Sequence, residues 1–191
     1  MSSFENILEF WFGNKNKADY GKPKKFWFTK NPNTDEEIKK QFSIDYELAK
    51  QGVLDSWKND PRSCLALIIL LDQIPRNIFR DQPQMYATDE KALSLAKFAV
   101  KHDYDQQLLP VERWFIYLPF EHSENLDNQC KAVALFRKLS HDPDSAMTID
   151  YAIRHFEVIR QFGRFPHRNQ ILGRETTPQE AEFLKQPGSS F

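Results

Sequence analysis

Residues 64–71 read CLALIILL, and this uninterrupted apolar run constrains the fold more than any other feature of the chain. Asp60 and Pro61 precede the run as a helix cap followed by a proline at the first helical position. A helix that is apolar on every side must be surrounded by other elements. The run is also much shorter than the ~20 residues that span a bilayer. We therefore predict a helix over 61–73 at the centre of the fold.

Helix boundary signals recur along the whole chain. The pattern S/T-x-x-E predicts a helix start, and Gly or Pro after an apolar-periodic segment predicts a helix end. No segment alternates apolar and polar residues between hairpin turns, so we expect no sheet. The predicted starts include Ser2, Thr34 and Thr177, and the predicted ends include Gly13, Gly52, Pro75, Pro119 and Gly163. The expected helices cover 3–12, 34–51, 61–73, 88–102, 110–118, 123–140, 148–162 and 178–185.

The links between these helices are short, which favours an all-α fold of stacked antiparallel hairpins. A chain of 191 residues is long enough for a single helical domain with its own core. Two loops stand out: a long segment over 13–33 rich in lysine and aromatic residues, and an arginine-rich segment over 163–176. A loop as long as the first is either packed by its aromatic side chains or functional.

Composition and motifs exclude several classes of function. Lys and Arg number 26 against 27 Asp and Glu, too balanced for a surface that binds nucleic acid specifically. The sequence has no glycine-rich phosphate motif, no G-x-S-x-G element and no metal-binding histidine spacing, so we expect no cofactor and no metal. No basic secretory signal is visible, and Cys64 and Cys130 form no disulfide framework. These features predict a cytoplasmic protein without a membrane partner.

Asp72 follows the apolar run directly, where an unpaired carboxylate would cost several kcal/mol. Arg76 and Arg80 are its obvious local partners. Asp72 therefore either forms a structural ion pair or orients an arginine toward a ligand. Gln73 and Asn77 lie in the same stretch and would supply orienting hydrogen bonds.

Two further segments place polar residues among apolar ones. Glu112 and Arg113 open an otherwise aromatic helix, where the helix dipole favours the carboxylate. Ser123 is expected to cap the following helix. His155 lies off the centre of the apolar face of helix 148–162, either as a hydrogen-bonded core residue or as a pocket residue that exchanges protons near neutral pH. His122, His155 and His167 are the candidate general acids or bases.

Residues 158–174 contain four arginines, one histidine and no acidic residue. A phenylalanine-proline pair follows Gly163 and holds an extended turn, which would present several of these side chains together. Guanidinium groups bind carboxylates and phosphates with paired hydrogen bonds, although a solvated basic loop fits the same pattern. The expected ligand-binding residues are Gln73, Arg76, Asn77, Arg80, Arg113, Arg164, His167, Arg168, Asn169 and Arg174, supported by Asp72 and Glu112.

The polar segments coincide with ordered motifs, namely LDQIPRNIFR at 71–80, ERW at 112–114, PFEHSE at 119–124 and GRFPHRN at 163–169. ILGRETTP at 171–178 and PGSSF at 187–191 extend the pattern. In these motifs the sequence resembles the bacterial domain-of-unknown-function 924 family, from residue 7 to the last residue. The resemblance implies a helical fold similar to tetratricopeptide-repeat proteins, stacked as a right-handed superhelix. It implies no activity.

Three hypotheses about function follow from these residues. The first is a binding protein whose arginine-rich pocket holds a small carboxylate or phosphate ligand, or the acidic end of a peptide. The second is a hydrolase or transferase that acts on an anionic substrate through a histidine. In the third, the arginine-rich loop is structural and anchors the C-terminal segment, with the terminal carboxylate of Phe191 bound by an arginine.

Overall fold

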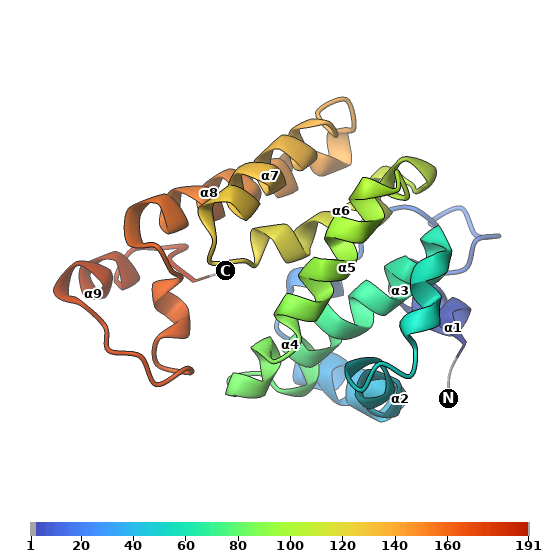
Figure 1. Ribbon diagram of the computed structural model, residues 1–191, viewed down its shortest axis with the longest axis horizontal. Coiled ribbons are helices and arrows are strands. Elements are labelled where there is room, and N and C mark those ends of the chain that lie inside the picture. Colours follow the sequence, from blue (N-terminus) through green and yellow to red (C-terminus); the bar gives the residue numbers. More distant parts are fainter. Residues whose placement is uncertain (1–2, 191) are drawn as a thin grey trace.

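The computed structural model describes residues 3–190, and every regular element within them is a helix or a short 3-10 turn (Figure 1). The all-α prediction is confirmed. No helix in this range is long and apolar enough to cross a membrane. The helices are α1 (Phe4–Phe12), α2 (Pro32–Lys50), α3 (Pro61–Asp72), α4 (Ile74–Ile78), α5 (Asp89–Lys101), α6 (Pro110–Glu121), α7 (Leu126–Arg137), α8 (Ala146–Phe162) and α9 (Pro178–Leu184).

Helix α3 forms the centre of the core, as its apolar run predicts. Its residues from Ser63 to Asp72 are all buried, and the helix contacts α1, α2, α5 and α6. Asp60 caps its first turn by accepting hydrogen bonds from the backbone N–H groups of Arg62 and Ser63. Burial raises the pKa of the Cys64 thiol to about 12, so this cysteine is no nucleophile.

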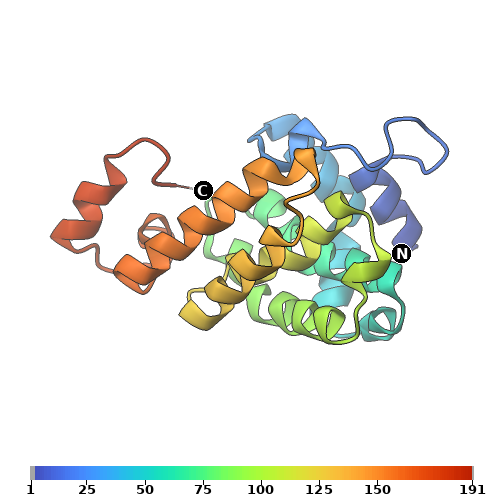
Figure 2. The ribbon, with the colours of Figure 1, turned by 90° about the horizontal axis from the view of Figure 1, so that it is seen from above.

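Beyond α3 the chain continues as successive packed helices, with α5 on α6, α6 on α7 and α7 on α8. Figures 1 and 2 show α7 and α8 lying side by side and leading away from the main body toward α9. This arrangement fits a tetratricopeptide-repeat-like stack. A second, small apolar cluster at the far end joins α8 to residues 163–190, here called the C-terminal arm. The cluster consists of Val158, Ile159 and Phe165 with Phe162 and Phe183 packed against them.

Several helix starts differ from the predicted ones by a few residues. Helix α2 begins at Pro32 rather than 34, because Asn31 accepts hydrogen bonds from two backbone N–H groups and Pro32 suits the first helical position. Ser3 caps α1, while the predicted cap Ser2 lies outside the described residues. Ser123 does not cap α7, which Asn125 caps instead. The capping box predicted at Thr177 is confirmed.

Two prolines behave differently from the prediction that they end helices. Pro119 lies inside α6, which continues to Glu121 rather than stopping at 118. Its position in the last turn removes only one backbone hydrogen bond. Pro75 lies in the first turn of α4, a short helix that the sequence did not predict. At that position the missing N–H has no helical partner to lose.

The long segment 13–33 is packed by its aromatic side chains. A 3-10 turn, Lys25–Phe28, buries Trp27 against the body. The indole N–H of Trp27 donates a hydrogen bond to the backbone carbonyl of Trp11 at 3.0 Å, and its ring lies 5.0 Å from that of Phe115. Of the two alternatives for this loop, aromatic packing accounts for the part around Trp27.

Candidate functional site

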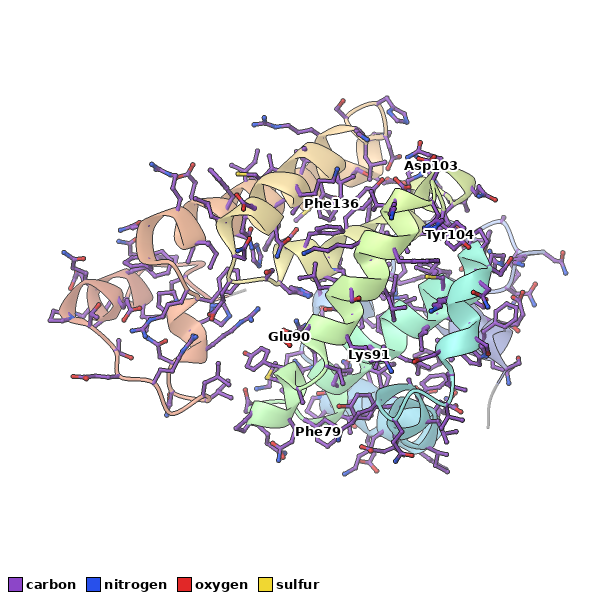
Figure 3. The ribbon with its side chains drawn as sticks, in the orientation of Figure 1. Phe79, Glu90, Lys91, Asp103, Tyr104 and Phe136 are labelled. Carbon is purple, nitrogen blue, oxygen red and sulfur yellow. The ribbon has the colours of Figure 1, made fainter. Side chains whose placement is uncertain are left out.

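Charged side chains from distant parts of the sequence meet where the C-terminal arm approaches the body. We call this group the junction cluster and define it as Asp72, Arg76, Asp89, His122 and Arg168. They come from the end of α3, from α4, from the start of α5, from the residue after α6, and from a 3-10 turn of the arm, Pro166–Arg168. Figure 3 shows Glu90, next to Asp89, on the side of α5 that faces the arm.

Asp72 is the buried centre of the junction cluster. Its Oδ1 accepts a hydrogen bond from His122 Nδ1 at 2.7 Å and lies 3.5 Å from Arg76 Nη2. Its Oδ2 accepts a hydrogen bond from Gln73 Nε2 at 2.6 Å. Burial alone would raise the pKa of Asp72, but His122 and Arg76 outweigh it and hold the pKa at about 2. Asp72 is therefore ionised, and the partner predicted for it proves to be Arg76 rather than Arg80.

His122 is held by Asp72 in one tautomer. Because the carboxylate only accepts hydrogen bonds, the proton lies on Nδ1 and the Nε2 atom carries the lone pair. Burial lowers the pKa of His122, and the positive charge of Arg76 lowers it further. A neutral imidazole with a free lone pair on Nε2 is the form that accepts a proton from a reacting group.

The two arginines of the junction cluster differ in how fully they are paired. Arg76 donates to Asp89 Oδ2 and to the backbone carbonyl of Met85, both at 3.1 Å, besides lying beside Asp72. Arg168 donates from Nη2 to the carbonyl of His122 at 3.0 Å, and its nearest carboxylate oxygen, on Asp89, is 3.7 Å from Nη1. Within residues 3–190 its buried Nε has no hydrogen-bond acceptor.

Aromatic rings flank the Arg168 guanidinium. Its central carbon lies 4.6 Å from the ring centre of Tyr86 and 4.5 Å from that of Phe165. Such cation–π contacts orient a guanidinium without neutralising it. Burial and the nearby Arg76 lower the pKa of Arg168 from its usual range. This arginine is thus held rigidly in place with incomplete charge compensation.

The other candidate histidines lie beside the junction cluster, His155 buried and His167 half-buried. His155 Nδ1 lies 2.8 Å from the Tyr151 carbonyl and 3.1 Å from Glu121 Oε1, as a hydrogen-bonded core residue would. Burial raises the pKa of Glu121 well above its usual range and lowers that of His155 well below it, so burial disfavours the charged form of both residues. Burial and the charge of Arg168 lower the pKa of His167 to about 4.

The remaining candidate arginines of the body have partners of their own outside the junction cluster. Arg80 donates twice to Asp35, with both distances 2.7 Å, and Asn77 donates to the same carboxylate at 2.8 Å. Arg113 donates to the Leu108 carbonyl at 2.9 Å near the opposite end of α6. These residues share no partner with the junction cluster.

Within the C-terminal arm the predicted residues form internal contacts. Arg164 donates to both carboxylate oxygens of Glu180, at 2.6 and 2.8 Å, and Asn169 Nδ2 lies 3.3 Å from the same carboxylate. Arg164 therefore ties the arginine-rich loop to α9. The terminal carboxylate of Phe191, which the structural hypothesis also invoked, lies outside the described residues.

Arg174 joins the arm to the body. It donates to both carboxylate oxygens of Glu124, at 2.7 and 3.0 Å, and to the Phe165 carbonyl at 3.0 Å. Glu124 also accepts the backbone N–H of Phe165 at 2.7 Å. Arg164 and Arg174 thus form structural contacts of the arm. Arg76 and Arg168 are the predicted arginines that lie near His122.

Glu112 does not support the arginines for which it was proposed. It accepts hydrogen bonds from the Tyr20 hydroxyl at 2.7 Å and from the Leu109 backbone N–H at 2.9 Å, and it lies 3.3 Å from Arg62. The second contact caps α6, as the helix dipole predicts. The first links the helix to the segment 13–33 instead of to the junction cluster.

The sequence motifs do not include two residues of the cluster region. Asp89 pairs with Arg76 and Tyr86 packs on Arg168. Asp89 is the first residue of α5, where a helix dipole favours an acid, and this position is the one signal that could have singled it out. Across residues 3–190, no group of three or more acidic, histidine or cysteine side chains is placed to hold a metal.

Comparison with known proteins gives a family assignment. Residues 7–188 match the model of the family described as "Bacterial protein of unknown function (DUF924)". The chain belongs to the DUF924 family. This DUF924 chain is also similar to a solved structure, the protein of unknown function ATU0120 from Agrobacterium tumefaciens, with 36% sequence identity and a TM-score of 0.84 over 95% of this chain and 96% of that chain. A comparison with curated proteins gives no match.

Proposed function

We propose that this DUF924 protein binds a small anionic ligand, a carboxylate or a phosphate, at the junction cluster. The observation that carries the proposal is the incomplete pairing of Arg168, which is 7% exposed and has a carboxylate no closer than 3.7 Å. Arg80, Arg164 and Arg174 each have a carboxylate within 2.7 Å. An anion bound to Nη1 of Arg168 would give this arginine the close anionic partner that Arg80, Arg164 and Arg174 already have.

The neutral imidazole of His122 should make anion binding at the proposed site depend on pH. Asp72 and Asp89 balance Arg76 and Arg168, so an added anion makes the cluster negative. Such a change favours protonation of His122, whose imidazole is otherwise neutral because of burial and Arg76. Anion binding therefore takes up a proton, and affinity rises as the pH falls below the neutral range.

Replacing Arg168 with glutamine should weaken anion binding about 10- to 100-fold, since a charge-assisted hydrogen bond contributes roughly 1.5–3 kcal/mol. Isothermal titration calorimetry with inorganic phosphate and with small di- and tricarboxylates measures the effect. Arg160→Gln removes the same charge from an exposed ion pair with Glu157 on α8 and serves as the matched control. Circular dichroism checks that both variants keep their helices. Equal affinity of Arg168→Gln and wild type would refute the proposal.

A second function, hydrolase or transferase chemistry, is favoured by the contact between Asp72 and His122. A buried carboxylate 2.7 Å from Nδ1 orients the imidazole as a general base, and two arginines lie on the same side of the molecule to stabilise developing negative charge. On this proposal the anionic ligand of the junction cluster is the substrate.

His122→Gln should then lower the turnover of a chromogenic phosphate or carboxylate ester about 100- to 10,000-fold, because that is the usual contribution of a general base. Anion affinity at neutral pH should change much less than in Arg168→Gln. His102→Gln, at the end of α5, is the matched control. Wild-type protein that binds phosphate but turns over no ester would leave anion binding intact and eliminate the enzymatic proposal.

A further inference from the structure

A separate cavity of about 190 Å³ lies between α1, the segment that follows it and the start of α3. Figure 2 shows this segment, the blue loop after α1, projecting beside that helix. For comparison, a cavity of roughly 150 Å³ accommodates benzene, so the space suits a ligand of similar or slightly larger size. None of its lining residues belongs to the junction cluster.

Arg62 lines the cavity with an incompletely engaged guanidinium. Its Nη1 lies 3.3 Å from both the Tyr20 hydroxyl and Glu112 Oε1, and its Nη2 lies 3.5 Å from Glu5 Oε2. Its buried Nε finds no acceptor in the part of the chain that the structure describes. All of these distances are long compared with the 2.7 Å of the Arg80 pair. Arg62 thus already contacts two carboxylates, but at long distances, and Nη2 carries a second N–H through which it can bind a carboxylate that enters the cavity.

Two carboxylates, opposite in charge to Arg62, line the same cavity. Glu5 and Glu9 both contribute to its wall, one helical turn apart on α1. Lys15 lies 3.6 Å from Glu5, and Glu9 accepts a hydrogen bond from Asn14 Nδ2 at 2.7 Å. Both acids are largely exposed, so neither is locked into a buried ion pair. The cavity thus presents cations and carboxylates within the span of one small molecule.

We propose that this cavity binds a free α-amino acid with a small side chain. Its carboxylate pairs with Arg62 and its ammonium group lies between Glu5 and Glu9. A zwitterion fits this wall because it satisfies both signs of charge at once, whereas a simple anion meets two carboxylates and a simple amine meets Arg62 and Lys15. This proposal is independent of anion binding at the junction cluster.

Calorimetric titration of the intact protein with L-alanine, propionate and L-alaninamide tests the proposal. Propionate lacks the ammonium group and L-alaninamide lacks the carboxylate, so each should bind at least about tenfold more weakly than L-alanine, the loss of one charge-assisted contact. Equal binding of L-alanine and propionate would overturn the zwitterion assignment. Absence of binding by L-alanine, glycine and L-serine would overturn the site itself.

Two variants localise the binding. Glu9→Gln removes one charge yet keeps an oxygen that accepts the Asn14 hydrogen bond, so it should weaken L-alanine binding and leave propionate binding unchanged or stronger. Arg62→Lys keeps the positive charge but removes the paired donors, so it should weaken both. Glu182→Gln, in an exposed ion pair on α9, is the matched control and should bind like wild type. If Glu9→Gln and Arg62→Lys both bind L-alanine as tightly as wild type, the proposal is wrong. L-Alanine would then bind elsewhere on the protein.

Discussion

Replacing Asp72 with asparagine should lower the free energy of unfolding by about 3–5 kcal/mol, the usual cost of removing one partner from a buried ion pair. The substitution keeps the shape of the side chain but leaves Arg76 and His122 facing an uncharged amide. For a chain of this size the midpoint of thermal unfolding should fall by about 10 °C. Chemical and thermal unfolding followed by circular dichroism measure both quantities.

Asp150→Asn is the control for this loss of charge, because Asp150 forms an exposed pair with Arg154 on α8. That variant should change stability by less than about 1 kcal/mol. The pH dependence of the free energy of unfolding distinguishes Asp72→Asn from Asp150→Asn further. Since the folded pKa of Asp72 is depressed to about 2, its stabilisation is complete above the unfolded value near pH 4 and disappears as the pH falls toward 2. Asp72→Asn should lack this dependence, and a stability equal to wild type at neutral pH would contradict the role given to Asp72.

Ile68→Ala should destabilise the protein by about 2–5 kcal/mol, because it opens a cavity in the middle of α3. Ile68 is fully buried, and the helix has neighbours on all sides that hold it in place. Little room therefore exists for the surrounding side chains to collapse into the space. Urea unfolding with a fitted midpoint and slope gives the difference in free energy.

Ile44→Ala is the matched control for this core substitution. Ile44 lies on α2 and is 69% exposed, so the same change should alter stability by no more than about 0.5 kcal/mol. Similar effects of the two substitutions would mean that α3 is not the centre of the core.

The helical class, the buried position of α3 and most helix boundaries could be predicted because they depend on local chemistry. Caps such as Asp60 and Thr177 act on backbone groups within three residues of themselves. The helix end wrongly predicted at Pro119 also has a local cause. Pro119 was expected to end a helix from its backbone chemistry alone, yet it lies in a last turn where only one hydrogen bond is lost.

The candidate site was harder to predict, because its pairings join residues far apart in sequence. Arg76 lies four residues from Asp72 and was foreseen, but His122 lies 50 residues from the same carboxylate. The acidic partners of Arg80 and Arg174 lie 45 and 50 residues away. From the sequence alone these distant partners are unknown. The arginines then appear unpaired, which suggests that they bind a ligand together. In the fold Arg80, Arg164 and Arg174 each pair with a carboxylate, whereas the buried Arg168 has none closer than 3.7 Å.

The two ends of this molecule are stabilised by different forces. Around α3 the stability comes from buried apolar surface, whereas the C-terminal arm meets the body through the Glu124 and Arg168 contacts and has only a small apolar cluster of its own. Salt screens the exposed part of such contacts but hardly affects the apolar core. We therefore expect the arm to open under milder conditions than those that unfold the core. A melting temperature measured for this protein would then report mainly on the core around α3.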